Sequence, residues 1–430
     1  MEIKNIKIKN FKSIESLNIK TNRKINLIVG KNNTGKTTII QSIYLAFSPK
    51  EFVKYYRNEY NLSSLGNLIN YSADKSIIEI QTNRIKSKKT IRLEISRTKI
   101  EDSIVFIKDQ VEDSIKKDKQ KIVELDHKLL SKYSKDFTRL FEVKINEIKV
   151  LIEQLITERK DEIINSIKDD IIIDREYYPS LETKKLIFDI GRQLYEKIME
   201  RTEKVTIKSD LNEMLDILHF PTSLNLNFYN FPELSLHKNK IYNGLLYINA
   251  GKINLRQFYN QSETTAMEIQ DIIKKTNMLP GLERFTFRNI VFKKDGIREE
   301  IPLEVMGDGF KVLIYIISMI LTYKDKKIKP VILVEEPEIH MHPGYINEFI
   351  KYLIDFSNNN NMQFFITTHS EDLINSFLRE DLDDESKNKL KKEFQIIRLT
   401  NINNENLVET IDYDGAFDSI NTLYLDLRGI

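Results

Sequence analysis

Three short runs of apolar residues stand out in the pattern of hydrophobic and polar positions, at residues 25–29, 331–334 and 364–368. Each run is nearly continuous rather than alternating, which is typical of parallel strands buried on both faces of a sheet. Polar residues or a glycine turn follow each run, and helix-like segments come next. This pattern predicts an α/β fold. Because ligands of open parallel sheets bind at the carboxyl ends of the strands, we expect the chemistry there.

A long stretch between the first and second runs has a different pattern. Neither Gly nor Pro occurs between Gly66 and Pro179. Residues 76–81 and 90–96 alternate as short strands do. Apolar residues three or four positions apart then mark one face of an amphipathic helix, at Leu130, Tyr133, Phe137, Phe141, Ile145, Ile148, Ile152 and Leu155. We therefore expect residues 101–245 to form a mainly helical insertion, with this stripe as a packing seam rather than a cofactor site.

A glycine-containing turn follows the first apolar run and fits the pattern G-x-x-x-x-G-K-[ST] of a phosphate-binding loop. A phosphate chain needs several backbone N–H groups converging on it, so Gly30 and Gly35 must supply unhindered backbone ahead of a helix. Lys36 is expected to reach the β- and γ-phosphates, and the Thr37 hydroxyl to coordinate Mg²⁺. The expected nucleotide-binding residues of this turn are Gly30, Lys31, Asn32, Asn33, Thr34, Gly35, Lys36, Thr37 and Thr38.

The second and third apolar runs end in side chains that suit nucleotide hydrolysis. Glu335 stands where a P-loop enzyme needs a carboxylate to hold Mg²⁺ through its water shell. Glu336 can orient and deprotonate the water that attacks the γ-phosphate. His369 can donate a hydrogen bond to that phosphate or to the water. A solvated acidic turn and a structural histidine are the alternatives, and the order of the motifs along the chain favours the catalytic interpretation.

A further glycine-containing segment, Gly307, Asp308 and Gly309, precedes an apolar helix expected at residues 312–323. Glycines followed by a helix make a helix N-terminus that can receive an anion. An isolated G-x-G is a weak signal. Its position between the insertion and the second apolar run strengthens the interpretation as a second nucleotide-binding segment.

Composition narrows the chemistry further. The 430 residues include no Cys, which excludes disulfides, thiol catalysis and Cys-ligated metal centres. The net charge is only +2, but residues 1–100 carry 20 basic and 7 acidic side chains, a net charge of +13. Such a basic segment is typical of proteins whose ligand or partner carries phosphate, although a solvated basic face is the alternative. No leader or membrane-spanning run is evident, so we expect a cytoplasmic protein without a membrane partner.

Together these segments resemble ABC-type ATPases of the SMC, RecF and OLD kind. Residues 8–14 are similar to the family's opening strand and turn. Residues 335–343 resemble its Walker B and D-loop segment, residues 307–311 its degenerate signature, and residues 368–370 its switch histidine. Two positions depart from the broader pattern, because Glu335 replaces the usual Asp and Gly307 the usual Ser. Gln81 is the one candidate for the family's Q-loop glutamine.

The resemblance implies an ATPase head in two parts, residues 1–100 and 246–430, separated by the insertion 101–245. ATP and Mg²⁺ are the implied cofactors. In this family the signature of one subunit completes the nucleotide site of the other, which implies an ATP-sandwiched homodimer. The acidic run at residues 381–385 is expected to be a solvated loop, because too few residues follow it for the TOPRIM nuclease domain of OLD-like nucleases.

Two biological roles stay open. One is a DNA-related process such as repair or chromosome maintenance, for which residues 84–100 supply seven basic side chains against Glu94 alone: Arg84, Lys86, Lys88, Lys89, Arg92, Arg97 and Lys99. The other is a regulatory or scaffold ATPase of an antiphage defence system that acts with a separate effector such as a nuclease. A transporter ATPase is less compatible, because the interval between Lys36 and Glu336 is far longer than in a compact transporter head.

Overall fold

The computed structural model describes residues 2–60, 62–84, 87–125, 145–173, 176–201, 245–252, 261–276, 278–294, 296–324, 330–360, 362–402 and 405–428. By packing, the chain divides into two compact units, each with its own hydrophobic core. The first comprises residues 1–52, 77–93 and 241–430, and the second residues 53–76 and 94–240. The domain boundaries expected at residues 100 and 245 stay a prediction.

A six-stranded sheet forms the centre of the first unit, in the order β15–β14–β3–β13–β12–β8. Every neighbouring pair is parallel except β14 with β15. The sheet therefore confirms the predicted α/β fold class, and the strands β3, β12 and β13 are buried along their whole length as their apolar runs predicted. The strands are β3 (Ile25–Gly30), β8 (Leu245–Asn249), β12 (Val331–Glu335), β13 (Gln363–Thr367), β14 (Phe394–Ile402) and β15 (Glu405–Asp412).

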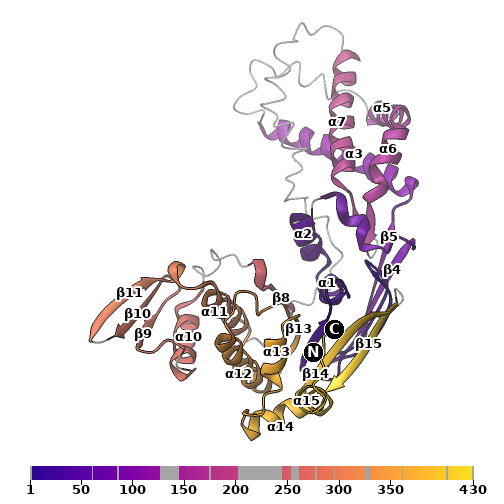
Figure 1. Ribbon diagram of the computed structural model, residues 1–430. Coiled ribbons are helices and arrows are strands. Elements are labelled where there is room, and N and C mark those ends of the chain that lie inside the picture. Colours follow the sequence, from indigo (N-terminus) through magenta and orange to yellow (C-terminus); the bar gives the residue numbers. More distant parts are fainter. Residues whose placement is uncertain are drawn as a thin grey trace. The chain divides into compact units, whose positions relative to one another are not determined.

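The order of strands determines where the motifs meet. β3 pairs with β13, and β13 pairs with β12, all in parallel. The residues that follow these three strands therefore emerge at the same edge of the sheet. Helices α11 and α12 pack beside one another next to this sheet (Figure 1). The helices of this part of the unit are α1 (Lys36–Phe47), α11 (Asp308–Leu321), α12 (Pro343–Asn360) and α13 (Glu371–Phe377).

An antiparallel layer carries the beginning of the chain. In the first unit β1 (Glu2–Phe11) pairs with β2 (Ile14–Lys20) on one side and with β4 (Lys75–Arg84) on the other. Apolar and polar residues alternate along these strands, so one face of the layer is buried, and this face includes the side chains of Ile6 and Ile8. The β1–β2 turn has Lys12 in the left-handed region, with φ of 53°.

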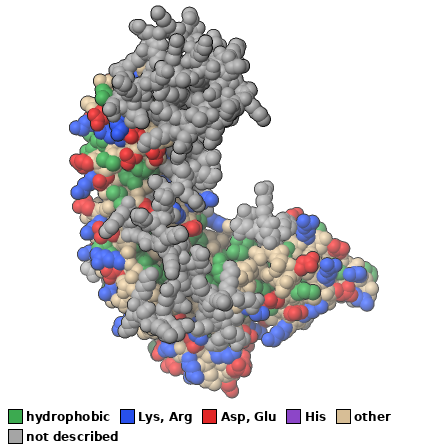
Figure 2. Space-filling view, turned by 180° about the vertical axis from the view of Figure 1, so that it is seen from behind, with side chains coloured by type: hydrophobic (Ala, Val, Ile, Leu, Met, Phe, Trp, Pro, Cys, Tyr) green, Lys and Arg blue, Asp and Glu red, His purple; other side chains and the backbone are tan. Residues whose placement is uncertain are grey.

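A smaller antiparallel sheet follows α10 (Glu263–Thr276) and leads into α11. It consists of β9 (Leu282–Phe285), β10 (Asn289–Lys294) and β11 (Ile297–Pro302). Figure 2 shows acidic and basic side chains interspersed over the face of this sheet turned to the viewer, without a patch of one sign. The first unit ends with α14 (Asp384–Glu393) and α15 (Tyr413–Asn421). Asp383 caps α14, so the acidic run at 381–385 begins a helix and is only partly a loop.

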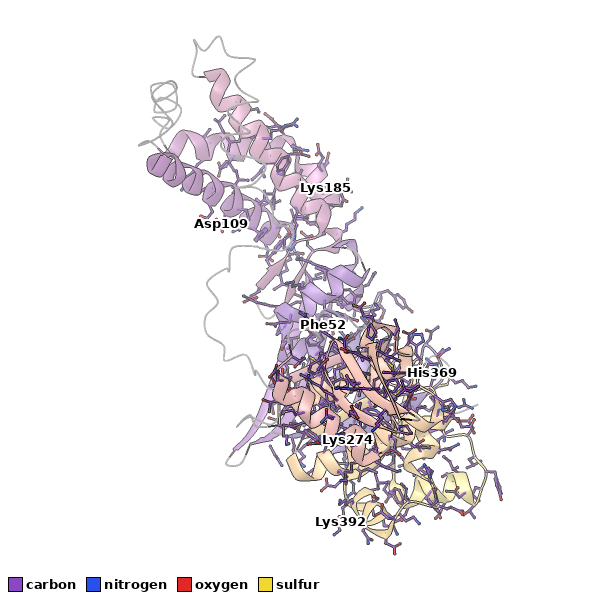
Figure 3. All side chains as sticks on the ribbon, turned by 90° about the vertical axis from the view of Figure 1, so that its left-hand side faces the viewer. Phe52, Asp109, Lys185, Lys274, His369 and Lys392 are labelled. Atoms are coloured by element: carbon purple, nitrogen blue, oxygen red, sulfur yellow. The ribbon has the colours of Figure 1, made fainter. Side chains whose placement is uncertain are left out.

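Helices dominate the second unit, in which Asp109 and Lys185 are labelled in Figure 3 on two of them. Its core includes Ile152 and Leu155 of the predicted stripe, both 1% exposed. The stripe residues from Leu130 to Phe141 lie outside the described residues. The unit contains α3 (Ile100–Leu125), α5 (Ile145–Glu158), α6 (Lys160–Ser166), η2 (Ile167–Asp169), β6 (Ile171–Ile173), β7 (Glu176–Tyr178) and α7 (Leu181–Arg201). Within the described ranges, every helix is too short or too polar to span a membrane.

Candidate nucleotide site

The glycine-containing turn predicted to bind phosphate connects β3 directly to α1. Gly30 has a φ of 152°, and a Cβ there would lie 2.5 Å from the carbonyl oxygen of Leu399 on β14 and 2.8 Å from Thr34 Oγ1. Gly35 ends the turn in the left-handed region, with φ of 99°, and caps α1 without a side-chain hydrogen bond. Glycine is thus required sterically at Gly30 and conformationally at Gly35, which agrees with a turn that presents bare backbone.

Lys36 begins α1 and points back into the turn. Its ammonium donates hydrogen bonds to the carbonyl oxygens of Gly30 at 2.7 Å and Lys31 at 2.8 Å, and the residue is 6% exposed. Burial lowers the pKa of Lys36, while Glu336 and Glu338 nearby act in the opposite direction. Thr34 and Thr38 are buried. The remaining residues of the turn, Lys31, Asn32, Asn33 and Thr37, are exposed at the edge of the sheet.

Glu335 ends β12 and is 6% exposed. One carboxylate oxygen, Oε2, accepts a hydrogen bond from Asn249 Nδ2 at 2.9 Å. The other, Oε1, is buried and has no hydrogen-bond partner among the described residues. Burial raises the pKa of Glu335 to about 7, although a hydrogen bond from Tyr247 opposes the shift. A buried carboxylate oxygen without a partner is a fitting ligand for a cation or its water shell, so the residues present fit Mg²⁺.

Glu336 and His369 meet at this edge from two neighbouring strands. Glu336 follows β12 in the left-handed region, with φ of 46°, and its backbone N–H donates to Thr367 O at 3.0 Å. His369, labelled in Figure 3, follows β13, and its Nδ1 lies 3.1 Å from Glu336 Oε1. Both side chains are partly exposed. A carboxylate beside an imidazole can accept a proton from a water molecule. The order of the motifs along the chain suggested this role, and the structure adds the short distance between the two side chains.

The second glycine-containing segment begins α11. Gly307 is the N-cap residue, Asp308 pairs with Lys311 at 2.7 Å, and this pairing lowers the pKa of Asp308. A Cβ on Gly309 would lie 2.3 Å from the carbonyl oxygen of His340, whereas a Cβ on Gly307 would meet nothing within 4 Å. Gly309 is therefore required for the backbone of this segment to approach the segment that follows Glu338, and Gly307 leaves its surroundings open.

The structure adds two side chains that the sequence did not single out. Asn249 ends β8 directly opposite Glu335 and holds its Oε2. Lys12, in the β1–β2 turn, donates to Gln41 Oε1 on α1, and burial lowers its pKa to about 8 while Glu335 opposes that shift. Gln81, the candidate Q-loop glutamine, lies on β4 opposite Asn5, in the antiparallel layer. A lone Asn after a five-residue strand carries no sequence signal, because its role depends on which strand it pairs with.

Comparisons of sequence and fold show which known proteins the chain is similar to. It is 23% identical over 388 residues to an ATP/GTP phosphatase of Helicobacter pylori, with 86% of each chain covered. It is 37% identical over 78 residues to the DNA replication and repair protein RecF of Francisella tularensis subsp. mediasiatica, covering 18% of this chain and 20% of that protein. The SMC head domain of Thermotoga maritima superposes with a TM-score of 0.45 at 13% identity, covering 96% of this chain and all of that one.

The family model of the AAA ATPase domain matches residues 1–374, which include the glycine turn, Glu335, Glu336 and His369. This match confirms the resemblance drawn from the motifs and the ATPase activity that it implies. The chain belongs to the AAA ATPase domain family.

Proposed function

We propose that the protein hydrolyses ATP with Mg²⁺, and that the signature segment of a second copy closes on the same nucleotide. One observation carries the proposal. The ends of β3, β12 and β13 bring the glycine turn, the Glu335–Glu336 pair and His369 to one edge of a parallel sheet. The motifs in these positions are the parts that phosphoryl transfer from a P-loop requires.

Each residue has a separate task in this proposal. Backbone N–H groups of residues 30–38 surround the phosphates, and the Lys36 ammonium exchanges the carbonyls of Gly30 and Lys31 for phosphate oxygens. Thr37 and Glu335 would hold Mg²⁺, which would neutralise negative charge on the phosphate chain. Glu336 takes the proton of the attacking water, and His369 donates a hydrogen bond to the γ-phosphate or to that water.

The second copy contributes Gly307, Asp308 and Gly309 to the nucleotide. These residues lie at the N-terminus of α11, a 14-residue helix, where free N–H groups and the helix dipole favour an anion. Gly307 has open space around it, so a phosphate or a neighbouring backbone can approach closely. Hydrolysis then removes the γ-phosphate, which both copies contact, and the dimer reopens.

Two variants test this proposal. Lys36→Ala should abolish nucleotide binding, because the variant loses the cation that neutralises the phosphates. Glu336→Gln should bind ATP but lose turnover, by about a hundredfold or more if the carboxylate is the base, and should accumulate as an ATP-bound dimer. Calorimetry measures binding, phosphate release measures turnover, and light scattering measures the oligomeric state. Glu348→Gln serves as the control, because Glu348 is a partly buried carboxylate of α12 that pairs with Lys351. A Glu336→Gln variant that turned over normally and stayed monomeric with ATP would disprove the mechanism.

We further propose that the protein contacts duplex DNA, because residues 1–100 have a net charge of +13 and the matched segment of RecF belongs to a DNA repair protein. Among the predicted contacts, Arg97 and Lys99 are exposed and Arg92 pairs with Glu79 at 3.3 Å. The side chains of Arg84, Lys86, Lys88 and Lys89 lie outside the described residues.

DNA contact through these residues predicts binding that weakens steeply with salt and strengthens with ATP. The slope of log Kd plotted against the logarithm of the salt concentration should fall by about one for each phosphate contact that is removed. Changing Arg97 and Lys99 to Ala should therefore weaken binding and flatten the slope, whereas Lys160→Ala with Lys185→Ala should not. Absence of binding at low salt would refute the proposal. It would also favour the regulatory role with a separate effector, which stays a prediction.

A further inference from the structure

Glu338 is a buried carboxylate three residues beyond Glu335, and its side chain is 7% exposed. Its Oε1 accepts hydrogen bonds from the Thr368 hydroxyl at 2.5 Å and from the backbone N–H of His369 at 3.3 Å. Its Oε2 is buried without a hydrogen-bond partner among the described residues. Burial is the main cause that raises the pKa of Glu338, and the hydrogen bond from Thr368 opposes it. Burying a carboxylate costs folding free energy, so stability alone does not explain why Glu338 is buried at this position.

Thr368 extends the contact along the chain. Its hydroxyl, which donates to Glu338, also accepts a hydrogen bond from the backbone N–H of Ser370 at 2.9 Å. Ser370 in turn caps α13 by accepting from Leu373 N. On the other side, the Thr368 N–H donates to Ile28 O of β3 at 3.1 Å. The backbone on both sides of His369 is thus attached, through one carboxylate, to the segment that carries Glu336.

The same arrangement determines where the imidazole lies. His369 Nδ1 is 3.1 Å from Glu336 Oε1 and 3.9 Å from Glu338 Oε1. If Glu338 did not bind the Thr368 hydroxyl and the His369 backbone N–H, only Glu336 would hold the partly exposed His369 side chain. An exposed pair of this kind contributes little stability. A misplacement of about 1 Å at a reacting group can lower a rate by about a hundredfold.

We propose that Glu338 is a positioning residue, which holds the Thr368–Ser370 turn so that His369 stays against Glu336 during ATP hydrolysis. The inference rests on the proposed function, since it assigns a support to the Glu336–His369 pair. It requires a hydrogen-bond acceptor at position 338 and does not require a negative charge there.

This requirement determines the variants. Glu338→Met keeps the volume and removes the acceptor, so kcat should fall about tenfold or more while KM for ATP stays within about twofold. Glu338→Gln keeps an acceptor oxygen and should restore kcat to within about threefold of the wild type. Thr368→Val should lower kcat as Glu338→Met does. The double variant Glu338→Met with Thr368→Val should be no slower than the slower single variant, because both remove the same contact.

Steady-state phosphate release over a range of ATP concentrations gives both constants, and Glu348→Met is the matched control that should leave both unchanged. An unaltered kcat in Glu338→Met, a loss in Glu338→Gln equal to that in Glu338→Met, or additive losses in the double variant would each overturn the proposal. If a Glu338 variant does not fold, Thr368→Val decides alone by its kcat and KM.

Wild type and Glu336→Gln are assayed together with these variants. A wild type that does not hydrolyse ATP contradicts the proposed function, whereas normal Glu338→Met turnover beside an inactive Glu336→Gln contradicts only this inference.

Discussion

Lys184 on α7 illustrates how strongly one buried residue can couple stability to pH. It is 0% exposed in the second unit, and burial together with the positive charge of Arg57 lowers its pKa to about 7. Nearby, Asp170 is also 0% exposed and accepts hydrogen bonds from Ser180 N, the Thr183 hydroxyl and the Tyr177 hydroxyl. Burial is the largest influence on the pKa of Asp170 and raises it, despite these donors. Both groups are thus less easily charged in the folded unit than in the unfolded chain.

The sign of the pH dependence follows from the lowered pKa of Lys184. Below about pH 7 both states are protonated and the folded state bears the full cost of the buried charge. Above it, only the unfolded state keeps the proton, so the free energy of unfolding should rise with pH by up to about 1.4 kcal/mol per unit. Lys184→Met should lack this contribution, so its free energy of unfolding should rise less steeply with pH than that of the wild type. Chemical denaturation followed by circular dichroism between pH 7 and 9 measures it.

Lys185→Met is the matched control, because Lys185 is exposed and pairs with Glu182 at the surface. Its stability should follow the wild-type pH dependence. Parallel pH dependences for wild type and Lys184→Met would show that Lys184 keeps its proton in the folded state.

At the scale of elements, the approach of α11 to the segment after β12 depends on one glycine. A Cβ on Gly309 would lie 2.3 Å from His340 O and 3.1 Å from Met341 Cα, and these are backbone atoms that cannot move aside cheaply. His340 itself lies in the left-handed region, with φ of 66°. The signature segment and the segment that carries Glu336 therefore share a tightly fitted backbone contact within one chain.

Gly309→Ala should consequently lower the free energy of unfolding of the first unit by about 2–3 kcal/mol, because a backbone segment must shift. Gly307→Ala should change it by less than about 1 kcal/mol, since Gly307 is an N-cap residue with open space. Thermal or urea unfolding of the two variants compares them directly. Equal stabilities would show that the two segments are not in contact in solution.

The elements that the sequence predicted well are those whose signal is local. The ends of strands β3, β12 and β13 were predicted to within one residue, because a strand buried on both faces is apolar throughout. β8 and β14 were not singled out. The second half of β14 contains the polar residues Arg398, Thr400 and Asn401, and its pairing with β3 identifies it as a strand of the central sheet.

The candidate site also contains residues that local motifs predicted and contacts that they did not predict. Spacing alone led to Lys36, Glu335, Glu336 and His369, and the structure brings Glu336 and His369 within 3.1 Å. The contacts that surround them join residues far apart in sequence. Asn249 reaches Glu335 and Lys12 reaches Gln41 only because strand order and turn conformation place them there. Such contacts leave no periodicity or motif in the sequence, so pattern reasoning could not find them.

At the scale of the whole molecule, the proposed homodimer divides each nucleotide site between two chains. The glycine turn of one copy and the signature segment of the other must then both be intact at the same site. A symmetric dimer contains two such sites. Two variants that inactivate different halves can therefore complement one another when mixed.

Lys36→Ala removes the first half of the site, and Gly307→Gln should block the second half while still folding, because the space around Gly307 is open. Each variant alone should be inactive. An equimolar mixture should recover up to about one quarter of wild-type turnover, since half of randomly paired dimers are mixed and one of their two sites is intact. Phosphate release from the mixture measures this recovery. If both variants fold but their mixture shows no turnover, the nucleotide site is not shared between copies.

The position of β3 between β13 and β14 has a consequence for the order in which the molecule can be built. β3 ends at Gly30, while its two neighbours begin at Gln363 and Phe394, so the strand that carries the phosphate-binding turn is synthesised long before either strand with which it pairs. Pairings between such distant segments form slowly and late. On the ribosome, the turn lacks its supporting strand until β14 has been synthesised, including the Leu399 carbonyl against which Gly30 fits. A translation product that stops before residue 394 would carry the nucleotide-binding sequence without the strand that supports it.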